Sequence, residues 1–466
     1  MLPDEILLAI FAYFADEDAF RKKDVEAWLS LVHVCRRWRR VTFGSPRRLN
    51  LRLFCGPKTP VMDALDIWPP LPLVVRGGAY DPKGVNNLLA GLQLSDRVYQ
   101  INLWGHSTSP MKKVLAGMLQ PFPELTDLVI KMPVQTVRAP PDSFLGGSSP
   151  HLRKLQLYGI SFPDLPILLF SATHLVDLQL CNIPNSGYIS PEAMATALST
   201  LPSLQLLSLK FLFSQSHPDS ESQPPPPTCS LLPALDTLRF KGVAKYLDDL
   251  VARVSAPRLN ILDVAFFNLD VFDATHVLKF IGRTSALGVL EAAHVTFQLD
   301  SAGVKLSSAT SGYRELSLEI PFQGLELQLL LLGRFVTLCL PPLSTSEDLY
   351  IYENIYPQPE WRPISIEDTR WLELLRPLTA VKKLYLSEKI ASRIVPTLQE
   401  LVGGRITEVF PALENIFLEG LQPWGPVQES IGKFIAARQL SNHPITVSSW
   451  DRDVNMRNQG VGFDER

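Results

Sequence analysis

The side chains that could carry out bond chemistry are widely dispersed in this sequence. The eight histidines, such as His33, His106, His174 and His294, lie far apart and lack the short spacings of metal-ligand sets. The sequence contains no glycine-rich phosphate loop, no G-x-S-x-G nucleophile turn and no H-E-x-x-H metal motif. We therefore predict that the protein is not an enzyme and has no catalytic residues, no metal site and no cofactor.

Two local clusters of charge could indicate a functional site, but a solvated helix face explains each of them more simply. Asp248 and Asp249 are adjacent, and adjacent residues of a helix do not face the same way, so we interpret them as a solvated face. The seven arginines between Arg36 and Arg52 suggest nucleic-acid binding. However, no aromatic residues are interleaved on the basic side to stack with bases. We favour a solvated helix face that steers an acidic partner, and predict no nucleic-acid partner.

Composition narrows the remaining possibilities. The chain has 466 residues, of which 46% are hydrophobic and 20% are charged, and its formal net charge is -3. Such a composition is typical of a folded protein and gives no overall attraction to nucleic acid or acidic membranes. No apolar run approaches the roughly 18 residues that suggest a membrane span, so we predict no membrane partner.

The five cysteines are odd in number, scattered, and include no C-x-x-C pair. Acids also interrupt the apolar residues at the N-terminus, which argues against a signal peptide. Both features are typical of a reducing compartment, so we expect the protein in the cytoplasm and/or the nucleus.

Two helical patterns at the N-terminus dominate the organisation of the chain. Pro3 suits the first position of a helix, and Asp4 and Glu5 favour the positive end of its dipole. Spacings of three and four residues predict one broad apolar face, formed by Ile6, Leu7, Ile10, Phe11 and Phe14. A second apolar stripe is formed by Trp28, Leu31, Val34, Cys35, Trp38 and Val41. A segment this short cannot bury so much apolar surface alone, so it needs a partner, either the rest of the chain or another protein.

This N-terminal pattern resembles the F-box, the short helical module that joins a substrate receptor to a cullin-type ubiquitin ligase. The most telling parts are the Leu-Pro start and the Val-Cys-Arg-x-Trp segment. The resemblance implies contact with a Skp-type adaptor, which bridges to the cullin scaffold, through Leu2, Pro3, Ile6, Leu7, Ile10, Phe11, Leu31, Val34, Cys35 and Trp38. The charged link between residues 15 and 28 is longer than usual and looks like the extended variant of fungal F-box-like proteins. The alternative is an ordinary helical pair docked on the main domain.

Beyond this module, a phrase close to P-x-L-x-x-L-x-L recurs with roughly the 20–29-residue period of leucine-rich repeats. Apolar residues two apart point to the same side of a strand, and helical patterns lie between the copies. Each strand–helix unit leaves apolar faces that only its neighbours can cover, so we predict an irregular solenoid with a parallel β-sheet. The leucines predicted to stack in register are Leu128, Leu155, Leu178, Leu207, Leu238 and Leu262. A less regular copy is assigned to Phe335, Leu338 and Leu340. A doubly wound α/β domain is the alternative.

The predicted fold class is therefore α/β, with three parts. Residues 1–48 form the helical F-box-like module, residues 49–440 the leucine-rich-repeat-like solenoid, and residues 441–466 a polar tail. Insertions are expected near 214–230, which is rich in proline and polar residues, and near 341–371, which breaks the repeat spacing.

The repeat phrase also predicts a binding surface. Residues between and after the inward pair of each strand must point outward onto the open sheet. The predicted target-binding residues are Trp104, Asp127, Lys154, Gln156, Tyr158, Asp177 and Gln179. Trp104 and Tyr158 are large aromatics at positions that packing does not require, and such residues are favoured binding anchors. The alternative is that inserted loops or the C-terminal segment cover this face.

Together these patterns predict a substrate-receptor subunit of a Skp-type adaptor and cullin ubiquitin ligase that binds a protein target through its repeats. Two other classes stay open. One is a ligase-independent interaction scaffold whose N-terminal helices cap the solenoid, and the other is an enzyme whose site is assembled from distant residues.

Overall fold

The computed structural model describes residues 2–16, 27–46, 48–49, 51–58, 65, 68–133, 136–139, 144–212, 229–267, 275–287, 290–308, 313–321, 324–339, 345–353, 368–401, 405–420 and 426–452. Most of the charged link, of the two predicted insertions and of the end of the tail lies outside these residues. The chain divides into two compact units, Met1–Phe213 and Ser214–Arg466. Each is described by itself below.

The first unit begins with three helices, α1 (Asp4–Asp16), α2 (Ala27–Val34) and α3 (Arg36–Gly44). The break between α2 and α3 falls at Cys35, whose backbone is extended. Its sulfur accepts a hydrogen bond from the amide of Trp38 at 3.5 Å and so satisfies one of the free N–H groups in the first turn of α3.

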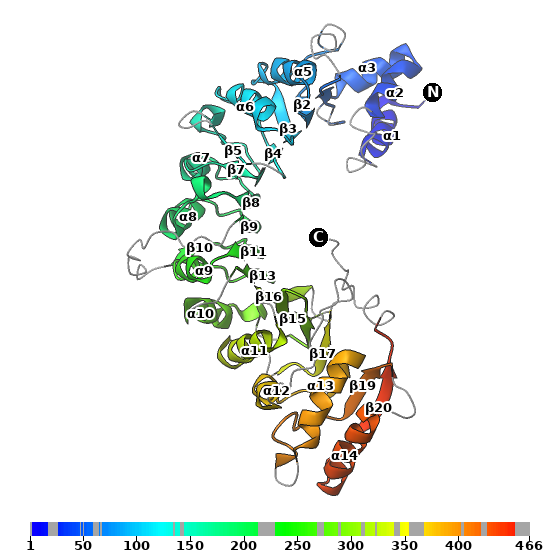
Figure 1. The fold of residues 1–466 in the computed structure, drawn as a ribbon. Coiled ribbons are helices and arrows are strands. Elements are labelled where there is room, and N and C mark those ends of the chain that lie inside the picture. The colour runs from blue at the N-terminus through cyan, green and yellow to red at the C-terminus, as the bar shows by residue number, and fades with distance from the viewer. Residues whose placement is uncertain are drawn as a thin grey trace. The chain divides into compact units, whose positions relative to one another are not determined.

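A parallel sheet of seven strands follows in the first unit. In spatial order its strands are β1 (Leu53–Cys55), β2 (Leu73–Gly78), β3 (Val98–Trp104), β4 (Asp127–Lys131), β6 (Lys154–Tyr158), β8 (Asp177–Ile183) and β9 (Leu206–Phe211). Helices α5 (Pro82–Leu92), α6 (Thr108–Ala116), α7 (Leu165–Ser171) and α8 (Pro191–Leu198) lie on one side of this sheet, and its other side is here called the open face (Figure 1). The described residues of this unit also form the small parallel pair β5 (Val137–Arg138) and β7 (Ile160–Ser161) and the turns η1 (Phe144–Gly147) and η2 (Asn185–Gly187).

The leucine ladder of the first unit confirms the predicted register. Leu128 lies opposite Leu155, Leu155 opposite Leu178, and Leu178 opposite Leu207 on successive parallel strands. Each of these side chains is at most 1% exposed. Burial of an apolar side chain contributes about 1.5–3 kcal/mol, so this repeated row is a main source of stability for the sheet.

Helix starts in the first unit follow from local chemistry. The side chain of Asp81 accepts from the amide of Gly84 at 2.8 Å, and Pro82 occupies the first turn of α5. Ser190 and Pro191 act in the same way for α8, where the serine hydroxyl accepts from the amide of Ala193 at 3.2 Å. Proline costs nothing at these positions because its missing N–H would have no partner in the helix.

The second unit is built around a mixed sheet. In spatial order its strands are β11 (Thr237–Gly242), β13 (Ile261–Phe266), β16 (Arg314–Pro321), β15 (Ser301–Ser308), β14 (Ala292–Phe297), β17 (Asp348–Glu353), β18 (Lys383–Leu386), β19 (Asn415–Glu419) and β20 (Thr446–Trp450). The helices are α9 (Ala244–Val251), α10 (Thr275–Arg283), α11 (Leu325–Cys339), α12 (Asp368–Leu375), α13 (Glu388–Gln399) and α14 (Pro426–Leu440). The short pair β10 (Ser230–Leu231) and β12 (Val254–Ser255) and the turn η3 (Ser285–Leu287) complete it.

The register prediction also holds here, since Leu238 lies opposite Leu262 and both are buried. One strand breaks the parallel pattern, because β15 runs antiparallel to both β14 and β16. Its residues Ala302, Val304 and Leu306 are buried at every second position, as expected of a strand with one covered face.

The repeat copy assigned to Phe335, Leu338 and Leu340 is wrong as a strand. Phe335 and Leu338 lie in α11, whose 15 residues form a continuous helix, and Leu340 lies outside the described residues. A strand not predicted from the sequence, β17, takes the place of that copy in the sheet. The run of apolar residues in α11 matches both a strand and a helix over a short window, and only its length distinguishes the two.

The interpretation of Asp248 as part of a solvated face is also wrong. Its side chain accepts from the backbone amides of His276 at 2.8 Å and Val277 at 2.9 Å, and its residue is only 9% exposed. The carboxylate on α9 therefore caps the positive end of the next helix, α10, in the manner of an N-cap residue.

Candidate partner-binding surfaces

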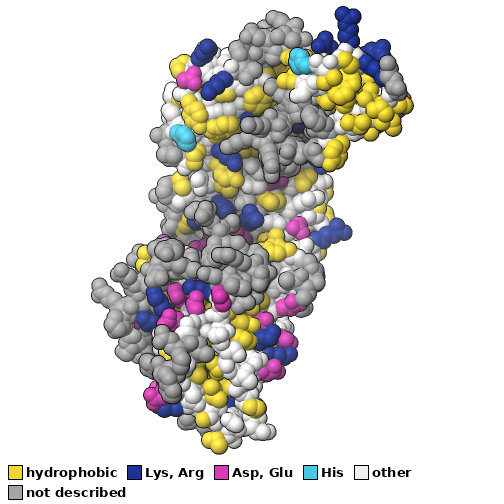
Figure 2. Space-filling model, turned by 90° about the vertical axis from the view of Figure 1, so that its right-hand side faces the viewer, with side chains coloured by type: hydrophobic (Ala, Val, Ile, Leu, Met, Phe, Trp, Pro, Cys, Tyr) yellow, Lys and Arg dark blue, Asp and Glu magenta, His cyan; other side chains and the backbone are white. Residues whose placement is uncertain are grey.

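One row of apolar residues, on α1 and just before it, faces solvent. Leu2, Ile6, Ile10 and Tyr13 are 52%, 47%, 48% and 69% exposed, and Val34 at the end of α2 is 59% exposed. Hydrophobic side chains gather beside lysines and arginines at the height of the N-terminal helices in Figure 2. Exposed apolar side chains in such a cluster mark an interaction site more often than isolated ones do.

The predicted adaptor-binding residues divide into two groups. Leu2, Pro3, Ile6, Ile10, Val34 and Cys35 are exposed. Leu7, Phe11 and Leu31 are at most 5% exposed, and Trp38 is half-buried. The second group forms the interior of the three-helix module, and the first group is available to a partner.

Tyr13 belongs to the exposed row but was not among the predicted contacts. The signal was present, because Ile6, Ile10 and Tyr13 are separated by four and three residues and so lie on one side of the helix.

An ion pair holds the start of α1 in place. Arg37 of α3 donates from Nη2 to Oδ1 of Asp4 at 2.7 Å, and the same nitrogen donates to the carbonyl of Leu2. This arrangement orients the segment that carries the exposed row. Arg37 is therefore engaged within the module, and Nε of Arg39 likewise donates to the carbonyl of Val32 at 2.9 Å. Arg36, Arg39 and Arg40 are nevertheless exposed, as predicted for a solvated helix face.

Trp28 connects the module to the segment that follows it. Its indole N–H donates to the carbonyl of Arg52 at 3.0 Å, and its ring packs edge-on against Trp68 at 5.5 Å. Part of the apolar surface predicted to need a partner is thus covered by the chain itself, while the outer row of α1 is not.

The predicted target-binding residues lie on the open face of the first unit. They occupy three rows that run across neighbouring strands. Asp127, Lys154 and Asp177 lie opposite one another on β4, β6 and β8. Gln156 pairs with Gln179 in the next row. The third row runs from Trp104 through Lys131 and Tyr158 to Cys181.

Hydrogen bonds link much of this polar surface. Asp177 accepts from the side-chain amides of Gln156 and Gln179 at 2.9 and 3.0 Å, and its Oδ2 lies 4.0 Å from Nζ of Lys154. The hydroxyl of Tyr158 donates to Gln179 at 3.0 Å. Gln156 is only 8% exposed because its neighbours surround it, so it positions Asp177 and offers little surface to a partner.

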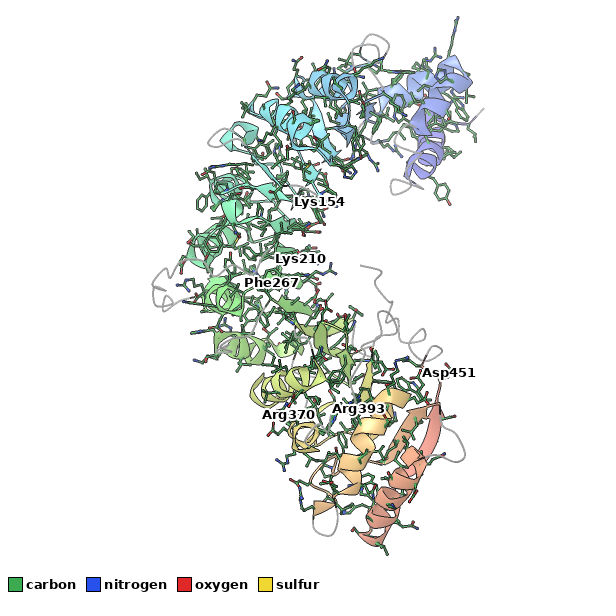
Figure 3. The ribbon with its side chains drawn as sticks, viewed as in Figure 1. Lys154, Lys210, Phe267, Arg370, Arg393 and Asp451 are labelled. Carbon is green, nitrogen blue, oxygen red and sulfur yellow. The ribbon has the colours of Figure 1, made fainter. Side chains whose placement is uncertain are left out.

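Two lysines of the open face differ from Lys154. Nζ of Lys131 lies 4.9 Å from the centre of the Tyr158 ring. Lys210 of β9 projects from the same side of the ribbon as Lys154 (Figure 3). Within the described ranges, neither Lys131 nor Lys210 forms an ion pair with a carboxylate.

A shallow groove of about 500 Å³ lies where the strands of the first unit begin. Its lining includes Tyr99, Glu124, His151, Arg153 and His174. His151 already shares a hydrogen bond with the carbonyl of Pro123 at 2.7 Å. The remaining lining is chemically mixed, with the carboxylate of Glu124, the guanidinium of Arg153 and the ring of Tyr99 among its groups.

The second unit carries a ladder of stacked rings that the repeat phrase did not reveal. His294, Tyr350, Tyr385 and Phe417 lie opposite one another on β14, β17, β18 and β19. Successive ring centroids are 4.5, 4.2 and 4.4 Å apart, and the planes are within 11° of parallel. Trp450 packs against Tyr350 and Tyr385 and is 3% exposed. Burial lowers the pKa of His294 to about 4, with the nearby charge of Lys305 as a further cause, so its ring is neutral at physiological pH.

Among the residues that the structure describes, no group of three or more histidine, cysteine, aspartate or glutamate side chains could hold a metal ion. The cysteines at 35, 181 and 229 are free thiols. No helix in the described part of the chain is both long and apolar enough to cross a membrane.

In a comparison with protein families, residues 1–50 match the F-box-like family. A comparison with curated protein sequences found no match. Among solved structures, the chain aligns with the leucine-rich repeat-containing protein LegL7 from Legionella pneumophila at 12% identity and a TM-score of 0.29. That alignment covers 82% of this chain and 96% of the bacterial chain.

The match over residues 1–50 coincides with α1, α2 and α3, on which the exposed apolar row lies. The fungal variant suggested by the charged link stays a prediction. The chain therefore carries an F-box-like helical region at its N-terminus, followed by a long, mostly parallel and leucine-rich-repeat-like sheet with helices.

Proposed function

We propose that this protein is the substrate-receptor subunit of a Skp-type adaptor and cullin ubiquitin ligase. The observation that carries the proposal is the solvent-exposed apolar row of Leu2, Ile6, Ile10 and Tyr13 within a region that matches the F-box-like family. Apolar side chains that are half exposed on a folded helix gain about 25 cal/mol for each Å² that a partner covers.

The proposed mechanism is proximity and involves no bond chemistry by this chain. The helical module would hold the adaptor and, through it, the cullin scaffold, while the sheet holds a protein target. Ubiquitin transfer then gains from the high effective concentration of the target at the ligase.

We place the target on the open face of the first unit. The half-buried or exposed side chains of this face are of mixed type and include the aromatic rings of Trp104 and Tyr158 and the charges of Lys131 and Lys154. Aromatic side chains on a rigid sheet suit protein recognition, because they bury a large area and lose little side-chain entropy when a partner binds. The lysine charges add electrostatic selectivity.

A second candidate function is a ligase-independent scaffold in which the N-terminal helices only cap the sheet. The contacts of Trp28 with Trp68 and with the carbonyl of Arg52 favour this alternative, because they resemble the packing of a terminal cap.

Adaptor capture by the purified full chain distinguishes the two candidates. Replacing Ile6 and Ile10 with glutamate should reduce capture of a recombinant Skp-type adaptor by at least about 30-fold, since central anchors contribute about 2 kcal/mol or more. The matched control replaces Ile167 and Phe170, which are 57% and 46% exposed on α7, and should leave capture unchanged. Unchanged capture by the folded Ile6/Ile10 variant, or no capture by the unmodified chain, would favour the scaffold.

A further inference from the structure

One row of the open face in the first unit combines aromatic rings with unpaired positive charge. We call it the lysine–aromatic strip, and its members are Trp104, Lys131, Tyr158, Cys181 and Lys210. The first four lie opposite one another on neighbouring strands. Leu180 pairs with Leu209 and Ile183 with Phe211, so Lys210 lies beside the strip's end at Cys181.

The two ammonium groups of the strip lack anionic partners in the described part of the chain. Lys131 contacts the face of Tyr158, which is an attraction to a neutral ring and leaves its charge uncompensated. Lys154, in contrast, has Asp177 nearby at 4.0 Å.

The carboxylates of the open face are too distant to neutralise the strip. Asp127 and Asp177 lie at the other ends of their strands, four residues from Lys131 and Cys181. At about 3.3 Å per residue this separation is about 13 Å, which exceeds the screening length of about 8 Å at physiological salt. Asp177 is also occupied by the amides of Gln156 and Gln179.

The pKa of the Cys181 thiol is sensitive to this positive charge. Burial raises the pKa of its thiol, and the charges of Lys210 and Lys131 oppose that rise. Both lysines therefore act on the same point of the strip from either side.

We propose that the lysine–aromatic strip binds an extended acidic segment of a target protein through aspartate or glutamate carboxylates, with an apolar side chain placed over Tyr158 and Cys181. This proposal rests on the proposed function and specifies the chemistry of its target. The positive charge of the two lysines, together with the neutral Tyr158 ring and the Cys181 thiol between them, is complementary to such a segment.

The spacing of the lysines favours separate carboxylates over a single phosphate. Lys131 and Lys210 lie on β4 and β9, three strand positions apart, which corresponds to about 14 Å at 4.8 Å per strand. One phosphate group cannot reach both ammonium groups, and the strip offers no arginine fork for it. An extended peptide that crosses the strands covers that distance in about four residues, so its acids should recur at that interval.

The test uses the purified full chain and a short fluorescein-labelled peptide in which glutamates recur every fourth residue with leucine midway. We expect salt-sensitive binding, measured by fluorescence anisotropy, and no binding of the same peptide with glutamine in place of glutamate. Lys131→Glu with Lys210→Glu should weaken binding at least about 30-fold, because two attractive charge pairs are lost and replaced by repulsion. The matched control, Lys112→Glu with Lys113→Glu on exposed positions of α6, should bind as the unmodified chain does.

Lys131→Gln with Lys210→Gln gives a second, uncharged variant if the reversed one does not fold. Equal binding of the glutamine peptide, full binding by a folded lysine variant, or binding only of a phosphoserine version of the peptide would overturn the proposal. The peptide assay contains no adaptor, so its result is independent of the Ile6 and Ile10 experiment that tests the proposed function.

Discussion

The ring of Trp38 packs against the ring of Phe11, with centroids 4.7 Å apart and planes inclined at 57°. This contact joins α3 to α1 inside the helical module, where Phe11 is fully buried. Trp38 was predicted as an adaptor contact, and the structure shows that it also holds the module together. A loss of adaptor capture on replacing Trp38 would therefore combine a lost contact with the adaptor and a destabilised module. Replacing Ile6 and Ile10 tests the contact alone, because their side chains are exposed.

Phe11→Ala should unfold the helical module preferentially. Removing a buried phenylalanine side chain costs about 3–5 kcal/mol, whereas Ile10→Ala on the exposed row should change the free energy of unfolding by less than about 0.5 kcal/mol. Hydrogen exchange of the amides in α1 and α3 measures this difference in the full chain. Equal protection of both variants would show that the Phe11–Trp38 contact does not stabilise the module.

Leu155→Ala should destabilise the sheet of the first unit by about 2–5 kcal/mol, because Leu155 is 0% exposed and lies between Leu128 and Leu178. The control is Leu119→Ala, the same replacement at a residue that is 41% exposed, with an expected effect below about 0.5 kcal/mol. Urea denaturation followed by circular dichroism measures both. A Leu155 variant as stable as the Leu119 variant would contradict the register described here.

Asp248→Ala should loosen the start of α10, since it removes the acceptor for two backbone amides and for the ring of His276 at 2.7 Å. The expected cost is about 1–3 kcal/mol, as for a cap residue whose partners become unsatisfied. Asp164 offers a matched control, because it directly precedes α7 and its side chain makes no capping hydrogen bond to that helix. Faster hydrogen exchange should appear in α10 for the first variant, and Asp164→Ala should leave α7 unaffected.

The stability of the second unit should depend on pH through His294. Its pKa is about 4 in the folded chain and about 6.5 when unfolded, so between these values the unfolded state binds more protons. The free energy of unfolding should therefore fall as pH decreases from 6.5 to 4, by roughly 3 kcal/mol, and this contribution should not change further below pH 4.

His294→Phe keeps a ring that can stack on Tyr350 and removes the titrating group. Urea denaturation at several pH values between 4 and 7 should give a flatter profile for this variant than for the unmodified chain. Parallel profiles would mean that other groups account for the loss of stability in acid.

The sequence by itself determined which residues of each strand face the core and which face the other side of the sheet. Leucines two apart must lie on the same side of a strand, so the spacing around Leu128, Leu155 and Leu178 already placed the intervening residues on the opposite side. Lys154 and Asp177, which were predicted to share one surface of the sheet, lie opposite one another on β6 and β8. The F-box-like region was also recognisable, since helical periodicity and the Leu-Pro start are local properties of the chain.

Only the tertiary structure decided which apolar residues of α1 are exposed. Ile6, Leu7, Ile10 and Phe11 fit one broad helical face, and the packing of α2 and α3 buries Leu7 and Phe11 while leaving Ile6 and Ile10 in solvent. The capping of α10 by Asp248 and the ring ladder beginning at His294 were likewise visible only in the tertiary structure. These contacts join residues far apart in the sequence, such as Asp248 and His276 at a separation of 28, and their energies depend on distances that no local pattern encodes.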